Sequence, residues 1–218
     1  MSVNPVYHHS EEKLLKELEW VKYAQTNPRG FEPLYNKYYE QIFRYIHQRM
    51  DDKEMAYDIT SQVFLKALNN IQKYEFRGVP FASWLYRIAK SELYQSFRDR
   101  KSSRTVNVES IHLYEIIDDL EEDRTEENRS IILSVLQEMD EEDVQMIELR
   151  FFEKRSFREI GEILEITENN AKVKSHRVVT RMKKLLSLPG GKAGAKGHGA
   201  ESKGRFFKEK DPVLRKAI

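Results

Sequence analysis

Apolar residues recur three and four positions apart along most of the chain before residue 188, and this spacing places them on one face of a helix. The pattern predicts successive amphipathic helices over Glu11–Gln25, Phe31–Met50, Asp52–Tyr74, Pro80–Lys101, Thr125–Met139 and a further segment that begins after Asp140. In the first helix we expect the buried positions to be Leu14, Leu15, Leu18 and Val21. Glycine and proline are sparse within these segments, so the sequence predicts an all-α fold.

Residues Ser156–Leu186 have the pattern of two short helices joined by a tight turn. Ser156 and Glu159 have the spacing of a capping box, and Thr167 is a candidate N-cap for the second helix. The second helix would bury Ala171, Val178, Met182 and Leu185 and present its cations on other faces. A cationic helix supported by a preceding helix is the arrangement that enters a DNA major groove. The alternative is a packing hairpin whose cations are only solvated.

Changes in composition divide the chain into segments. Between Glu109 and Glu127 there are nine acidic residues and one arginine, whereas the chain after Leu188 has eight Lys or Arg and three acids. We therefore expect two small helical domains joined by an acidic flexible linker. The predicted segments are an N-terminal helix that packs on the first domain (1–27), a first domain (28–102), an acidic linker (103–127), a helix-turn-helix domain (128–187) and a basic disordered tail (188–218).

The composition argues against an enzyme and against a membrane protein. The chain has no cysteine, and its six histidines are scattered without the i, i+4 spacing of a helical metal site. It also lacks a glycine-rich phosphate loop and a nucleophile elbow. We therefore expect no catalytic residues, no metal, no cofactor and no small-molecule substrate. No apolar stretch has the length of a membrane span or a signal peptide, which predicts a cytoplasmic protein without membrane insertion.

The helix predicted over Pro80–Lys101 carries a second polar surface. Its apolar stripe consists of Phe81, Trp84, Leu85 and Ile88. By this spacing Tyr86 and Tyr94 lie off the stripe, close to Lys90 and Arg98. Aromatic rings can stack on unpaired bases while neighbouring cations hold the backbone, so the surface is a candidate for single-stranded DNA. The alternative is that these tyrosines are partly exposed residues without a ligand.

Two blocks of the sequence resemble a known family. The run DDKEMAYDITSQVFLKA over residues 51–67 and the run FASWLYRIAK over residues 81–90 resemble region two of sigma-70-family RNA polymerase sigma factors. The runs FREI at residues 157–160 and KVKSHR at residues 172–177 resemble region four of the same family. The resemblance covers Phe31 to Leu186, and it is strongest to the small extracytoplasmic-function (ECF) group.

The resemblance implies three binding surfaces. The helix over residues 52–68 would bind a coiled coil of the largest subunit of core RNA polymerase through Glu54, Asp58 and Gln62, which share one helix face. The loop over residues 75–79 and the following helix would hold melted bases of the promoter −10 element through Arg77, Tyr86, Arg87, Lys90, Tyr94 and Arg98. The helix after Thr167 would read the −35 element in duplex DNA through Glu168, Asn169, Asn170, Lys172, Lys174 and Arg177.

The same resemblance implies that the second domain also sits on the polymerase flap, and that an anti-sigma factor is a further partner. Two positions depart from the family pattern. Ser91 stands where the family usually has Asn, and Glu165 stands in the turn where it usually has Gly. A stand-alone helix-turn-helix regulator with an N-terminal signal or dimerisation domain is the alternative function, but it leaves the pattern of the first domain unexplained. A nucleic-acid enzyme would need an acidic metal cluster that the sequence lacks.

Overall fold

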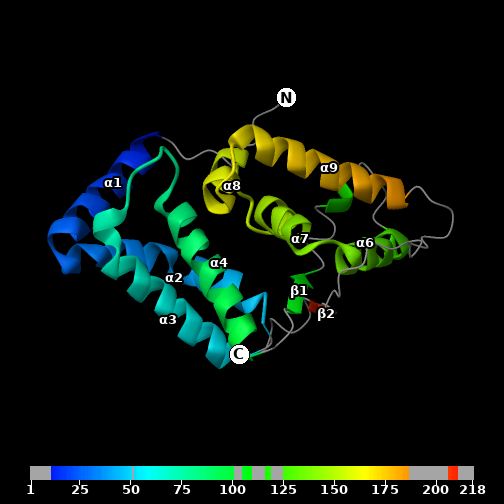
Figure 1. The fold of residues 1–218 in the computed structure, drawn as a ribbon, viewed down its shortest axis with the longest axis horizontal. Helices are drawn as coiled ribbons and strands as arrows, with labels where there is room; N and C mark the ends of the chain where they lie inside the picture. The colour runs from blue at the N-terminus through cyan, green and yellow to red at the C-terminus, as the bar shows by residue number, and fades with distance from the viewer. Residues whose placement is uncertain are drawn as a thin grey trace. The chain divides into compact units, whose positions relative to one another are not determined.

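A computed structural model of the chain describes residues 11–50, 52–100, 105–109, 116–118, 125–186 and 206–210 (Figure 1). The helices are α1 (Glu11–Thr26), α2 (Glu32–His47), α3 (Lys53–Asn69), α4 (Phe81–Arg100), α6 (Glu126–Glu138), α7 (Glu141–Ile147), α8 (Phe157–Leu164) and α9 (Glu168–Leu186). Short 3-10 turns occur at Pro28–Phe31 and Ile71–Lys73, and a π-helical turn follows α7 at Glu148–Phe152. The predicted all-α fold is confirmed.

The start of several helices follows from local hydrogen bonds that the sequence predicts. The side chain of Asp52 accepts from the backbone N–H groups of Glu54 and Met55 at 3.0 and 3.1 Å and caps α3. Ser156 and Glu159 form the predicted capping box at the start of α8, and the Thr167 hydroxyl accepts from Asn170 N at 3.1 Å in α9. Such caps satisfy backbone donors that have no partner within the helix.

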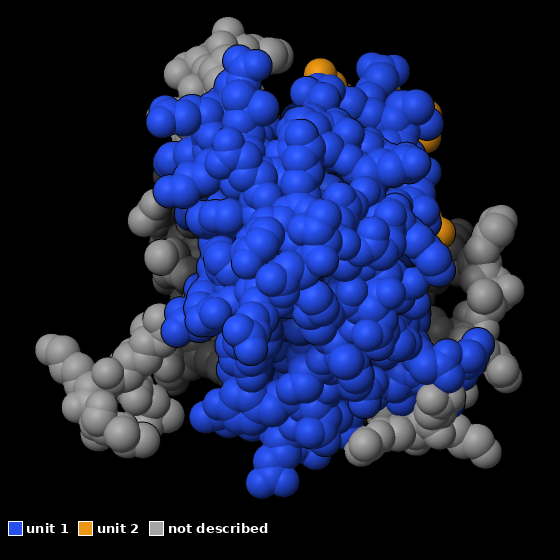
Figure 2. Space-filling model, turned by 90° about the vertical axis from the view of Figure 1, so that its left-hand side faces the viewer, with its two compact units in different colours: residues 1–102, 154–171 blue, residues 103–153, 172–218 orange. Residues whose placement is uncertain are grey.

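The described residues belong to two compact units, of which unit 1 comprises residues 1–102 and 154–171. Figure 2 shows one packed face of unit 1. In this unit α4 packs against α2, α3 and α8. The core between these helices is largely aromatic, with the Phe31 ring 6.4 Å from Phe64 and 6.3 Å from Phe81 in edge-to-face contacts. Leu34 and Leu85 are fully buried beside them, so unit 1 has a hydrophobic core of its own.

The buried face of α1 differs from the predicted one. Leu15 is 52% exposed, whereas Glu17 is only 4% exposed and Val21 is buried. The prediction for Leu15 was therefore wrong, and Leu14 and Leu18 are only partly buried. The helix turns Glu17 inward because this carboxylate has hydrogen-bond partners on neighbouring elements.

Unit 2 comprises residues 103–153 and 172–218 and has a separate hydrophobic core. Ile132 and Leu136 of α6, Val144 of α7 and Val178 and Met182 of α9 contribute to it. The burial of Val178 and Met182 agrees with the predicted inner face of α9. The side chain of Leu185, which was predicted on the same face, lies outside the described residues.

Part of the predicted acidic linker is structured. Residues 116–118 form a helical turn, and Ile116 and Ile117 are fully buried in the core of unit 2. Strand β1 (Thr105–Glu109) pairs in parallel with β2 (Phe206–Lys210), which lies in the predicted tail. Apart from these segments and residues 125–127, the linker and the tail lie outside the described residues. Within the described part of the chain, no helix is both long and apolar enough to span a membrane.

Candidate nucleic-acid interface

An aromatic cluster stands where the loop after α3 joins the start of α4. The ring of Trp84 is 5.3 Å from Tyr74 and 5.4 Å from Phe81, and Tyr74 is 5.0 Å from Phe81. Phe81 is buried, but Trp84 is only partly buried and keeps part of its ring accessible. The sequence pattern assigned Trp84 to the core, so the partial exposure of this residue was not predicted.

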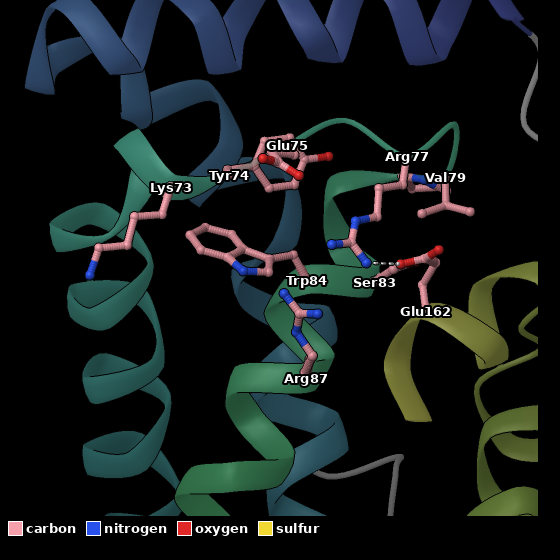
Figure 3. A pocket seen from close by; sticks show the side chains of 10 residues that line it. Lys73, Tyr74, Glu75, Arg77, Val79, Ser83, Trp84, Arg87 and Glu162 are labelled. Atoms are coloured by element: carbon pink, nitrogen blue, oxygen red, sulfur yellow. Dashed lines mark hydrogen bonds and ion pairs between the residues drawn. The ribbon is translucent and has the colours of Figure 1, made fainter. Parts of the chain in front are cut away.

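A small pocket opens beside this cluster (Figure 3). It has a volume of about 50 Å³, and its lining combines the rings of Tyr74 and Trp84 with the cations of Lys73, Arg77 and Arg87 and the carboxylates of Glu75 and Glu162. Aromatic and cationic groups together at its rim suit the stacking of bases from single-stranded nucleic acid. Burial, with a smaller effect of Glu17, raises the pKa of the Tyr74 hydroxyl.

Two of the predicted −10 cations form ion pairs, one with a carboxylate of α8 and one with a carboxylate of the turn that follows α8. Arg77 Nη1 is 3.3 Å from Glu162 Oε2, and Arg87 Nη1 is 3.5 Å from Glu165 Oε1. Arg158 donates to the carbonyl of Arg77 at 3.0 Å. These groups are solvent-exposed to differing degrees, and exposed ion pairs contribute about 0–1 kcal/mol. The pairs therefore hold the arginine side chains in place only weakly.

The remaining predicted −10 residues occupy α4. Tyr94 and Arg98 are exposed, and Lys90 is half-buried. Tyr94 is 38% exposed. Arg98 also donates to Gln95 one turn earlier. Arg77, Arg87, Lys90, Tyr94 and Arg98 thus all keep some accessible surface, and their contact with DNA remains a prediction.

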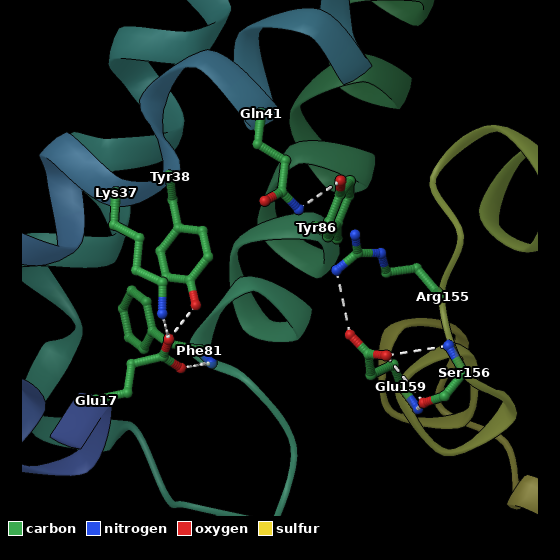
Figure 4. Close-up of polar contacts among 9 residues, drawn as sticks. All are labelled: Glu17, Lys37, Tyr38, Gln41, Phe81, Tyr86, Arg155, Ser156 and Glu159. Carbon is green, nitrogen blue, oxygen red and sulfur yellow. Dashed lines mark hydrogen bonds and ion pairs between the residues drawn. The ribbon is translucent and has the colours of Figure 1, made fainter. Parts of the chain in front are cut away.

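The prediction that Tyr86 lies on this surface was wrong. Its side chain is fully buried, and its ring makes an edge-to-face contact with Tyr45 at 4.8 Å. Its hydroxyl accepts from Gln41 Nε2 at 2.9 Å, and the Arg155 guanidinium lies 5.5 Å from its ring centre (Figure 4). The buried stripe of α4 is rotated from the predicted one and consists of Phe81, Ala82, Leu85, Tyr86, Ala89 and Leu93. Tyr86 is a core residue that binds α4 to α2.

A tight turn joins α8 to α9. Glu165 ends α8 in the left-handed region with φ 59° and ψ 40°, a conformation that usually favours glycine. The N–H of Ile166 then donates to the carbonyl of Gly161 at 2.9 Å. A Cβ at Gly161 would lie 2.8 Å from the Ile166 carbonyl oxygen, so this close approach requires glycine. The chain accepts backbone strain at Glu165 instead of changing the turn.

Helix α9 exposes most of the residues predicted to read the −35 element. Glu168, Asn169, Asn170, Lys172 and Arg177 are exposed. Lys174 differs, because it is half-buried and its Nζ lies 2.7 Å from Glu142 Oε2 and 4.0 Å from Asp143 Oδ1 of α7. Burial raises the pKa of the Asp143 carboxyl, and Lys174 partly offsets that effect. In this structure Lys174 therefore stabilises the packing of α7 on α9.

Helix α3 has one exposed polar face. Glu54, Asp58 and Gln62 are all exposed, four residues apart. Beside them lie two exposed apolar side chains, Tyr57 at 41% and Leu65 at 57%. Sequence reasoning missed Leu65, although an apolar residue off the buried stripe is a signal for a contact surface. The combination of acids with exposed apolar groups suits a protein partner.

Among the described residues, no group of three or more His, Asp or Glu could hold a metal ion.

Comparison with known proteins identifies both halves of the chain. Residues 34–103 match the family model of Sigma-70 region 2, and residues 135–184 match that of Sigma-70, region 4. Together these matches cover more than half of the 218 residues. The solved structure of CnrH in complex with the cytosolic domain of CnrY superposes with a TM-score of 0.50 at 17% identity. That match covers 78% of this chain and 96% of CnrH, and shows a shared fold.

Curated relatives agree with these matches. RNA polymerase sigma factor YlaC of Bacillus subtilis is 31% identical over 163 residues, which cover 72% of this chain and 92% of YlaC. ECF RNA polymerase sigma factor BldN of Streptomyces coelicolor is 27% identical over 177 residues, which cover 78% of this chain but only 65% of BldN. The chain belongs to the sigma-70 family of RNA polymerase sigma factors, in its ECF group.

Proposed function

We propose that this ECF sigma factor binds core RNA polymerase and directs promoter-specific initiation of transcription. The observation that carries the proposal is the order of the two family regions in one chain, each with its own exposed polar surface. A stand-alone regulator would need only the helix-turn-helix, and it would leave the exposed face of α3 and the aromatic loop without a role.

The exposed face of α3 is the proposed contact with the coiled coil of the largest polymerase subunit. Glu54, Asp58 and Gln62 would provide charge and hydrogen bonds, and Leu65 would bury apolar area beside them. Because the Asp52 cap starts α3 independently of this face, substitutions on the face can remove binding while the helix remains folded.

The loop after α3 and the outer face of α4 are the proposed site for melted −10 bases. Trp84 and Tyr94 would provide stacking surfaces, and Arg77, Arg87 and Lys90 would attract the phosphate backbone. Arg77 and Arg87 would have to exchange Glu162 and Glu165 for phosphates. Exposed ion pairs of this kind are weak, so the exchange would cost little.

Helix α9 is the proposed reader of the −35 element in the DNA major groove. The amides of Asn169 and Asn170 suit adenine, and Arg177 suits guanine, whereas Lys172 suits a phosphate. We also propose that an anti-sigma protein regulates this chain. Support comes from the similar structure, in which CnrH is bound to the cytosolic domain of CnrY.

Run-off transcription with purified core RNA polymerase on a promoter library tests this function. We expect the chain to co-purify with core enzyme, to bind promoter duplex poorly by itself, and to initiate at a small set of related promoters. Sequence-specific binding of duplex DNA without core, together with a failure to form holoenzyme, would instead support the stand-alone regulator.

A further inference from the structure

We propose that α1 is a clamp that holds both ends of the loop over residues 71–80, and that Glu17 and Gln25 are positioning residues for promoter opening. The inference rests on the proposed role of this loop at the −10 element. Helix α1 precedes the residues that match region 2, which begin at residue 34.

Glu17 holds the end of the loop where α4 begins. Its Oε2 accepts from the backbone N–H of Phe81 at 2.6 Å, while its Oε1 accepts from Lys37 Nζ and the Tyr38 hydroxyl (Figure 4). Phe81 is the first residue of α4, so its N–H has no partner within the helix. A carboxylate at a helix N-terminus is also favoured by the helix dipole. Glu17 thus caps α4 from a different helix.

Gln25 holds the other end of the same loop. Its Nε2 donates to the carbonyl oxygens of Ile71 at 3.0 Å and Tyr74 at 3.3 Å. In return the side-chain amide of Gln72 donates to the backbone carbonyl of Gln25. Glu17 and Gln25 both lie on α1, eight positions apart, which corresponds to about two helical turns. One rigid helix therefore fixes both ends of the loop.

The loop held at these two ends supplies part of the pocket lining. Tyr74, Glu75, Arg77 and Val79 line it from the loop, and Trp84 and Arg87 line it from α4. Inside the loop, Gly78 has φ 72°, a conformation that allows the chain to bend sharply. A loop fixed at its ends presents Tyr74 and Arg77 in one arrangement before DNA arrives, which lowers the ordering cost of binding.

Two substitutions test the clamp. Glu17→Gln replaces one carboxylate oxygen with an NH₂ group. That group would face N–H or O–H donors that the carboxylate of Glu17 now accepts from. Gln25→Ala removes the two hydrogen bonds at the other end without a change in charge. Glu19→Gln is the matched control, because Glu19 lies on the same helix and is exposed. We expect both test variants to assemble with core polymerase normally and to form about tenfold fewer open complexes. A pre-melted bubble template should restore part of that loss.

Hydrogen exchange on the protein without DNA provides a readout that is independent of promoter function. Amides of residues 71–81 should exchange faster in both variants, while the amides of α3 remain as protected as in the Glu19→Gln control. Unchanged exchange in this loop would overturn the clamp, and faster exchange with normal promoter opening would overturn its positioning role.

If Glu17→Gln does not fold, Gln25→Ala decides alone. If the unmodified chain fails to initiate with core polymerase, the proposed function fails, while the exchange data still decide whether the clamp exists.

Discussion

Trp84 is the residue whose substitution best separates base stacking from helix packing. Its ring is partly exposed and makes aromatic contacts with Tyr74 and Phe81, at 5.3 and 5.4 Å. Aromatic pairs contribute about 0.5–1.5 kcal/mol each, so Trp84→Ala should destabilise unit 1 by about 2 kcal/mol, including the lost apolar area. Small domains have about 5–15 kcal/mol of stability, and the variant should therefore remain folded.

The effect on promoter opening should be larger than the effect on assembly. Stacking of one base on an aromatic ring is worth about 1–3 kcal/mol, which corresponds to an open-complex equilibrium lowered about 5- to 150-fold. The variant should assemble with core polymerase and form closed complexes, yet show weak permanganate reactivity of −10 thymines. A pre-melted bubble template should restore transcription, because the cost of unpairing has already been met.

Tyr86→Phe is the matched control for Trp84→Ala. Tyr86 lies on the same helix but is fully buried, and its substitution removes one hydrogen bond from Gln41, worth about 1 kcal/mol. We expect a small loss of thermal stability and normal promoter opening. The reasoning is wrong if Trp84→Ala opens duplex promoters normally, or if Tyr86→Phe shows the opening defect while it remains folded.

Three further substitutions address the other surfaces. Asp58→Lys should abolish co-purification with core polymerase while circular dichroism stays helical, whereas the exposed Glu40→Lys on α2 should bind normally; retained binding by the first variant would refute the α3 contact. Asn170→Ala should make the free energy of promoter binding less favourable by about 1–3 kcal/mol and relax the base preference at one −35 position. Lys172→Ala should weaken binding to all promoters alike and reduce the salt dependence of binding, and selection from a promoter library distinguishes the two outcomes. Glu162→Gln should free Arg77 and tighten binding of a single-stranded −10 oligonucleotide by up to about fivefold, as measured by fluorescence anisotropy; weaker binding would contradict competition between the carboxylate and phosphate.

Much of the helical layout could be predicted from the chain because its causes are local. The capping box of Ser156 and Glu159 and the caps at Asp52 and Thr167 each involve residues within one turn. Their hydrogen bonds form wherever the helix lies, so the starts of α3, α8 and α9 followed from residue type and spacing. The motif runs of the two sigma regions also identified the family, since they occur in the family's order.

The sequence alone determined the helices, the helix-turn-helix and the family, whereas only the tertiary structure decided which side of each helix is buried. A shift of one residue turns a helix face by about 100°, and weakly patterned helices such as α1 and α4 leave that rotation to their neighbours. The ring of Tyr45 and the amide of Gln41, both on α2, contact Tyr86 in the core, and this rotation of α4 places Trp84 partly at the surface. Glu17 is buried because Lys37, Tyr38 and the N–H of Phe81 surround its carboxylate. These partners lie 20 or more residues away in the chain, so no local pattern could reveal them.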